Sequence, residues 1–135
     1  MALIVRTDID MSRGKIVAQA AHAAVEVALK ARGTAMFERW RQAGSRKISL
    51  IAPDLETLDD ISSKLAHGIV SHMVKDAGHT EIPPGTYTVL GLLGPRNSID
   101  ILTENLKFDI EREREFSEKL RADMDAELQK RQECE

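Results

Sequence analysis

The stretch that most constrains the fold is a polar turn at residues 10–15 with an apolar segment before it and a long helical segment after it. Residues 2–7 are rich in Leu, Ile and Val, which is typical of a strand buried on both faces. Residues 14–32 are rich in Ala and Val and predict a helix, with Ser12 as its N-cap and Gly33 at its end. A strand that leads through a short turn into a helix indicates an α/β fold.

The same turn is suited to bind an anion. A helix start presents free backbone N–H groups and the positive end of the helix dipole, and Arg13 and Lys15 add two cations there. A phosphate is the simplest ligand for such a turn. The Gly-x-x-x-x-Gly-Lys-Ser/Thr pattern of a P-loop is absent from the sequence.

One polar stripe crosses the helix that follows. Its members share one helix face and are Lys15, Gln19, His22 and Glu26. Nearly every other position is apolar, so we expect a helix packed on most sides. Two interpretations of the stripe remain open at this point: it lines a cleft, or it is the thin edge that a buried helix shows to water.

The rest of the chain alternates between strands and helices. Hydrophobic periodicity and turn residues predict strands over 46–52, 69–74 and 86–93 and helices over 34–43, 54–68 and 98–104. Helical segments connect the first three strands, which predicts that they are parallel neighbours. The fourth strand follows a loop too short for a crossover and is expected to be antiparallel. We therefore expect a three-layer α/β sandwich: a four-stranded mixed sheet with helices on both faces.

Composition restricts the class of protein. At 135 residues the chain fits one domain with a sizeable core. No apolar run approaches the roughly 18 residues that span a membrane, and no signal peptide is visible. A single cysteine, Cys134, excludes an internal disulfide and a cysteine-based metal site, which fits a reducing, cytoplasmic location. The net charge of −3 is concentrated near the end of the chain, so a near-neutral body could still bind RNA, with salt sensitivity.

The segment from 109 to 135 differs from the body. It predicts a charge-dense helix with ten acidic and six basic residues over that range. Apolar residues recur near one face, namely Ile110, Phe116, Leu120, Met124 and Leu128. Two interpretations are open: a solvated helix folded along the domain, or a seam for self-association or a partner protein.

A second polar cluster, residues 75–81, directly follows the third predicted strand. Ligands of open α/β sheets bind beyond the carboxyl ends of the strands. If the first and third strands are parallel, Asp76, His79 and Thr80 lie near the polar stripe. Taken singly, each residue also has a structural explanation, such as a turn for Asp76. Together they favour acid–base hydrolysis or phosphate-ester binding, and the histidine spacing gives little support to a metal site.

Two sequence blocks identify a family. They are Gly-Lys-Ile-Val-Ala-Gln-Ala-Ala-His-Ala at 14–23 and Asp-Ala-Gly-His-Thr at 76–80, with Pro84-Gly85-Thr86 and Thr88-Val89-Leu90 following in order. The chain resembles the archaeal and eukaryotic type of peptidyl-tRNA hydrolase over about residues 2–108. The resemblance implies a hydrolase domain over 1–108, with residues 109–135 outside the family pattern as a charged helical extension.

The resemblance also implies a function. It implies hydrolysis of the ester between peptide and tRNA by a cytoplasmic enzyme, commonly a homodimer, with no membrane anchor and no required metal or organic cofactor. The family's catalytic positions correspond to Lys15, Gln19, His22, Asp76 and Thr80. Candidates for contacts with the tRNA backbone are Arg6, Arg13, Lys75 and His79, the last standing where the family usually has arginine. The alternative is a non-catalytic RNA- or protein-binding module on the same fold.

Overall fold

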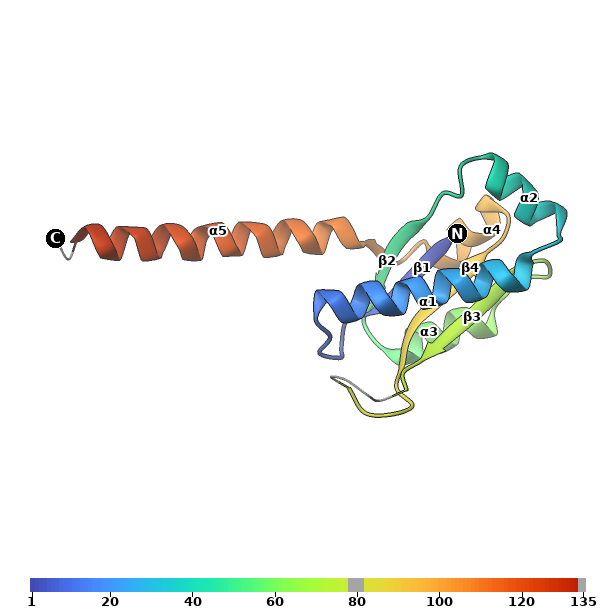
Figure 1. Ribbon diagram of the computed structural model, residues 1–135, viewed down its shortest axis with the longest axis horizontal. Coiled ribbons are helices and arrows are strands. Elements are labelled where there is room, and N and C mark those ends of the chain that lie inside the picture. Colours follow the sequence, from blue (N-terminus) through green and yellow to red (C-terminus); the bar gives the residue numbers. More distant parts are fainter. Residues whose placement is uncertain (78–81, 134–135) are drawn as a thin grey trace.

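The structure, a computed structural model, describes residues 1–77 and 82–133 (Figure 1). The description also leaves out some side chains near and within the last helix, namely those of residues 107–113, 115–116 and 131–133. In chain order the elements are β1 (Ala2–Arg6), α1 (Arg13–Ala31), α2 (Ala35–Gln42), β2 (Ile48–Ala52), α3 (Leu55–Ser63), β3 (Val70–Lys75), β4 (Tyr87–Leu93), α4 (Arg96–Thr103), β5 (Lys107–Phe108) and α5 (Asp109–Glu133).

The sheet is mixed, as predicted, and its strand order is β3-β4-β1-β2-β5. β1 and β2 are parallel, whereas β4 is antiparallel to both β1 and β3. The first three strands therefore point the same way. The prediction that all three are neighbours is wrong for β3, because β4 lies between β3 and β1. The two-residue β5, antiparallel to β2, was not predicted from the sequence.

Helices cover both faces of the sheet, which confirms the three-layer sandwich. Alternate residues of β1 point to opposite faces. On one face Leu3 and Val5 pack in a cluster with Ala23 of α1. On the other face Ile4 packs in a cluster with Leu58 of α3. The helix α2 continues the α1 layer, and α4 joins the α3 layer through its buried residue Ile99.

Local capping chemistry fixes the starts of three helices as the sequence predicts. The side chains of Ser12, Thr34 and Asp54 each accept a hydrogen bond from the backbone N–H three residues later, at 3.2, 3.1 and 2.8 Å. The predicted end of the third helix is wrong. α3 stops at Ser63, and Gly68 has a φ of +89° in the turn that leads to β3.

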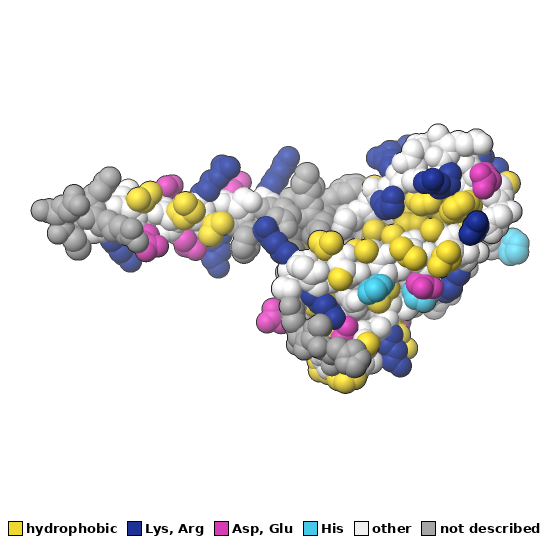
Figure 2. Space-filling view, viewed as in Figure 1, with side chains coloured by type: hydrophobic (Ala, Val, Ile, Leu, Met, Phe, Trp, Pro, Cys, Tyr) yellow, Lys and Arg dark blue, Asp and Glu magenta, His cyan; other side chains and the backbone are white. Residues whose placement is uncertain are grey.

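The outer face of α1 is exposed. Val17, Val25 and Leu29 have exposed fractions of 68, 56 and 58%, so the prediction that the helix is packed on most sides is wrong. Figure 2 shows hydrophobic side chains gathered along this face of the molecule. The helix packs on the sheet through buried residues such as Ala23 and Val27, while its other large apolar side chains on the outer face remain exposed.

The helix α5 extends away from the body (Figure 1). Leu120, Met124 and Leu128 are all exposed on it, so the interpretation of a helix folded along the domain is wrong. The side chains of Ile110 and Phe116, which complete the predicted apolar face, lie outside the description. Across the described ranges, no helix has the length and apolar character needed to cross a membrane.

Candidate active site

The site lies at the edge of the sheet where β1 and β3 both end. The chain leaves β1, passes the Ser12 cap and enters α1, whose third residue is Lys15. Asp76 directly follows β3. Lys15 Nζ lies 2.5 Å from Asp76 Oδ1, and the two side chains are only 12 and 5% exposed. The predicted meeting of the two segments is confirmed, since β1 and β3 share a direction although they are not neighbours.

The backbone around Asp76 is fixed on both sides. The Asp76 N–H donates to the Thr86 carbonyl, and the Gly85 N–H donates to the Asp76 carbonyl, both at 2.8 Å. These bonds continue the pairing of β3 with β4 past the register shift between Val74 and Lys75. The carboxylate is therefore held in place by the sheet rather than by a free loop.

Gln19 lies one helical turn after Lys15 and is buried. Its Nε2 donates to Thr88 Oγ1 at 2.9 Å, and the Thr88 hydroxyl lies 3.5 Å from the Val74 carbonyl. Thr88 is fully buried in β4. It was not predicted as a site residue, because a threonine in a buried apolar strand resembles an ordinary core position. The sequence did offer one indication of its importance: Thr88 belongs to the Thr88-Val89-Leu90 segment that resembles the family.

We expect the Gln19–Thr88 hydrogen bond to contribute measurably to stability. Thr88→Val keeps the side-chain shape but leaves the buried Gln19 amide without this acceptor, which should lower the free energy of unfolding by about 1–3 kcal/mol. Urea unfolding measures this value. The matched control is the double variant Gln19→Met/Thr88→Val, in which both polar partners are gone and the loss should be smaller. A single variant as stable as the wild type would contradict this account.

A groove runs from the Lys15–Asp76 pair between α1 and β3. Its volume is about 920 Å³. The polar stripe of α1 lines one wall, which confirms the cleft interpretation of that stripe. The lining residues from α1 and the turn before it are Ser12, Gly14, Lys15, Ala18, Gln19, His22 and Glu26, and those from β3 and just beyond are His72, Val74, Lys75, Asp76 and Ala77. His22 is exposed within this groove.

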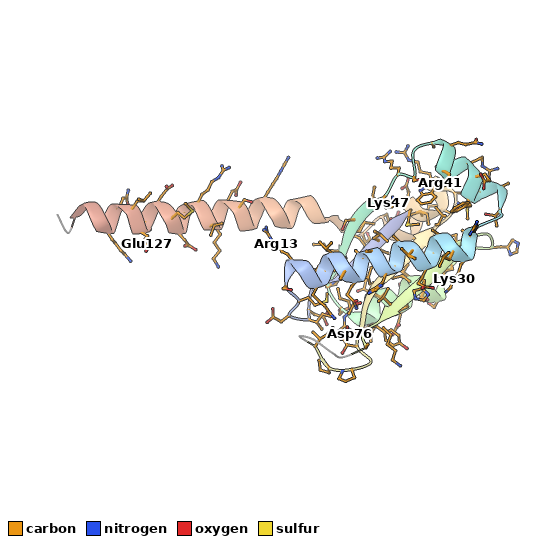
Figure 3. All side chains as sticks on the ribbon, viewed as in Figure 1. Arg13, Lys30, Arg41, Lys47, Asp76 and Glu127 are labelled. Atoms are coloured by element: carbon orange, nitrogen blue, oxygen red, sulfur yellow. The ribbon has the colours of Figure 1, made fainter. Side chains whose placement is uncertain are left out.

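A cluster around Lys30 lies next to His72, which lines the groove. Lys30 Nζ donates to the Ser71 carbonyl at 3.1 Å and lies 2.9 Å from His72 Nδ1. Burial lowers the pKa of His72, and the positive charge of Lys30 adds to this effect against the opposing Glu26 carboxylate. Figure 3 shows Asp76 near the start of α1 and Lys30 toward the other end of that helix.

The described residues that were predicted to contact tRNA differ in their position relative to the groove. Lys75 is exposed and lines the groove, with its Nζ 5.8 Å from the Tyr87 ring centre. Arg13 is exposed at the start of α1 but is not part of the groove lining. Arg6 lies outside the groove: its guanidinium donates twice to the Asp8 carboxylate, at 2.9 and 2.8 Å, and once to the Tyr87 carbonyl. The bond to Arg6 lowers the pKa of Asp8.

Four of the five predicted catalytic residues therefore come together: Lys15, Gln19, His22 and Asp76. The fifth, Thr80, and the predicted contact His79 lie outside the described residues. Within the described ranges, no three His, Cys, Asp or Glu side chains cluster to hold a metal ion. A carboxylate paired with an ammonium in a groove can position a water and stabilise a developing negative charge.

Comparison with known proteins shows the family to which the chain belongs. The family model for peptidyl-tRNA hydrolase PTH2 matches residues 1–108. The chain is 42% identical over 116 residues to a peptidyl-tRNA hydrolase of Sulfolobus acidocaldarius, covering 79% of this chain and 97% of that protein. It is 41% identical over 114 residues to human mitochondrial peptidyl-tRNA hydrolase 2, covering 79% of this chain and 62% of the human protein.

A yeast relative, the Saccharomyces cerevisiae peptidyl-tRNA hydrolase 2, is 38% identical over 117 residues, which is 79% of this chain and 56% of that protein. The match thus spans nearly all of the archaeal relative and somewhat over half of the human and yeast ones. The matched residues contain the whole groove and the Lys15–Asp76 pair. The chain belongs to the peptidyl-tRNA hydrolase PTH2 family.

Proposed function

We propose that this chain hydrolyses the ester that joins a peptide to the terminal ribose of tRNA, in the cytoplasm and without a metal ion. The observation that carries the proposal is the largely buried Lys15–Asp76 pair in a groove. It occurs in a chain whose relatives are named peptidyl-tRNA hydrolases. In this proposal residues 1–108 are the hydrolase domain, and 109–135 are an accessory extension.

Ester hydrolysis needs an activated water, a stabilised oxyanion and a proton for the leaving ribose oxygen. An ionised carboxylate only accepts hydrogen bonds, so Asp76 orients the water and takes its proton. Lys15, which donates to that carboxylate, presents its positive charge to the oxyanion and gives a proton to the leaving ribose oxygen; the proton that Asp76 took from water then returns to Lys15. Gln19, fixed by Thr88, and the exposed His22 orient substrate and water along α1. Thr80 joins this set through the family resemblance.

The tRNA part of the substrate needs cations outside the reacting centre. Lys75 and Arg13 are exposed on the two segments that meet at the Lys15–Asp76 pair, so they suit contacts with phosphates. His79 is a further candidate through the resemblance. Arg6 is less suited, since Asp8 and the Tyr87 carbonyl engage its guanidinium.

Hydrolysis of an N-acetylaminoacyl-tRNA in the presence of EDTA tests the proposal. We expect release of the free N-acetylamino acid to persist in EDTA. We also expect kcat/KM to fall as KCl rises, because tRNA binding releases counterions. Binding of the substrate without cleavage would instead favour the alternative of a non-catalytic RNA-binding module on the same fold.

We also propose that the chain forms a homodimer through the exposed apolar face of α1. Val25 lies at the middle of that face, between Val17 and Leu29, and pairing two such faces would remove their apolar area from water. Val25→Asp should therefore give a monomer in light scattering. The matched control, Leu120→Asp on the exposed face of α5, should remain a dimer. The reverse result would move the interface to α5.

A further inference from the structure

The strand β3 forms an edge of the sheet. Among the described strands it pairs with β4 on one side, and no described strand lies on its other side (Figure 1). An edge strand directs half of its backbone N–H and C=O groups away from the sheet, where they can pair with another extended chain. This edge borders the groove that contains the Lys15–Asp76 pair, since His72, Val74 and Lys75 of β3 line it.

The hydrogen bonds of β1 establish which groups of β3 face outward. The Ile48 N–H donates to the Met1 carbonyl, and the Thr7 N–H donates to the Ala52 carbonyl, both at 3.0 Å. Odd-numbered residues of β1 therefore pair with β2, and the even-numbered residues Ala2 and Ile4 pair with β4. Their β4 partners are Leu92 and Leu90, so the intervening Gly91 directs its backbone groups to β3.

The same alternation then determines which residues of β3 direct their backbone groups toward the open edge. His72 is opposite Gly91 and shares its hydrogen bonds, so Ser71 and Met73 face the open edge. The Lys30 bond to the Ser71 carbonyl agrees with this direction. Beyond the register shift, Lys75 is opposite Tyr87, whose carbonyl accepts from Arg6 of β1 rather than from β3. The backbone groups of Lys75 therefore face the open edge as well.

Lys30 and Asp76 bound the usable part of this edge. Lys30 occupies the Ser71 carbonyl, and Asp76 directly follows Lys75. Between them the backbone groups of Met73 and the N–H of Lys75 face outward. At about 3.3 Å per residue, the distance along the strand from Met73 to Asp76 is about 10 Å, enough for the last three or four residues of an extended peptide.

We propose that the peptide of peptidyl-tRNA binds as an added strand along the edge of β3, parallel to it, through backbone hydrogen bonds to Met73 and Lys75. This proposal rests on the proposed function. The ester lies at the carboxyl end of the peptide and must reach the Lys15–Asp76 pair. That pair lies beyond the carboxyl end of β3, so the peptide extends back from it along β3 and is parallel to that strand. Backbone pairing accepts any side-chain sequence, which suits a substrate whose peptide varies.

Substrates of increasing peptide length give the first test. We expect kcat/KM to rise from N-acetylaminoacyl-tRNA to a substrate with three or four residues and then to level off, because longer peptides pass beyond the usable edge. Each added hydrogen bond should contribute about three- to tenfold. A kcat/KM independent of peptide length would overturn the proposal. The one-residue substrate tests the hydrolase function separately, since it needs no pairing with β3.

N-methylation of single peptide residues in a four-residue substrate gives the decisive test, because it uses the wild-type protein. Along a paired strand only alternate residues direct their N–H toward β3. N-methylation should therefore lower kcat/KM by about three- to tenfold at alternate positions and much less at the positions between them. Losses without this alternation would overturn the proposal.

A pair of edge variants complements the substrate series. Met73→Pro removes an outward N–H without breaking the pairing with β4, a change that edge strands tolerate. It should reduce the ratio of kcat/KM between the four-residue and one-residue substrates by about three- to tenfold. Ser71→Pro removes an outward N–H that lies farther from Asp76, and should leave this ratio unchanged. Equal ratios in the wild type and Met73→Pro would count against the pairing.

Discussion

Lys15→Ala is expected to lower kcat for peptidyl-tRNA hydrolysis by about 10²-fold or more, which is the effect of removing one preorganised group that stabilises an oxyanion. Lys15 is positioned for this role by the start of α1 and by its bond to Asp76, and it is 12% exposed. Its charge is thus held near the reacting ester before the substrate arrives. The measurement is kcat at saturating N-acetylaminoacyl-tRNA, with circular dichroism to establish that the variant is folded.

The chain offers a matched control for this experiment. Lys64 and Asp60 form a second lysine–aspartate pair, 3.0 Å apart, at the end of α3, but their side chains are 66 and 57% exposed. Exposed pairs of this kind contribute little, so Lys64→Ala should keep the wild-type kcat. A folded Lys15→Ala protein with a kcat like that of Lys64→Ala would remove Lys15 from the mechanism.

Asp76→Asn is expected to lower kcat by about 10²- to 10⁴-fold, the range typical for loss of a positioned general base. The substitution keeps the size of the side chain and its place after β3, while the amide cannot take a proton from water. The measurement is again kcat at saturating substrate. Asp60→Asn provides the matched exposed control, and an Asp76→Asn variant with wild-type kcat would contradict the assignment of the base.

The two residues should also act as a unit. Because Lys15 donates to Asp76, each variant alone disturbs the partner, so the double variant Lys15→Ala/Asp76→Asn should lose little more activity than the poorer single variant. If the fold-loss of kcat in the double variant equals the product of the two single-variant losses, the two residues have independent roles, which would contradict the paired mechanism.

Much of this site was predictable because its determinants are local. Ser12 caps α1 by short-range hydrogen bonding, which places Lys15 at the helix start. Asp76 follows an apolar strand directly. Because β1 and β3 were expected to be parallel, the segments that follow them were expected at the same edge of the sheet, which brings Lys15 close to Asp76. The position of β4 between those strands could not be predicted in the same way, because strand order depends on long-range pairing that hydrophobic periodicity does not encode.

Other features escaped sequence reasoning for a physical reason. Periodicity marks a residue as apolar but does not say whether a partner covers it, so α1 was expected to be packed on most sides although its Val25 and Leu29 are exposed. Thr88 is the opposite case. Its hydroxyl has a specific partner in Gln19, but a single polar atom in a buried strand leaves no periodic signal.

The most direct test of the central claim is release of free peptide from a peptidyl-tRNA in EDTA, by wild type, Lys15→Ala and Asp76→Asn at equal concentrations of folded protein. The account predicts rapid release by the wild type and release slower by about 10²-fold or more in both variants. Equal rates in all three proteins, or no release by the folded wild type, would contradict it.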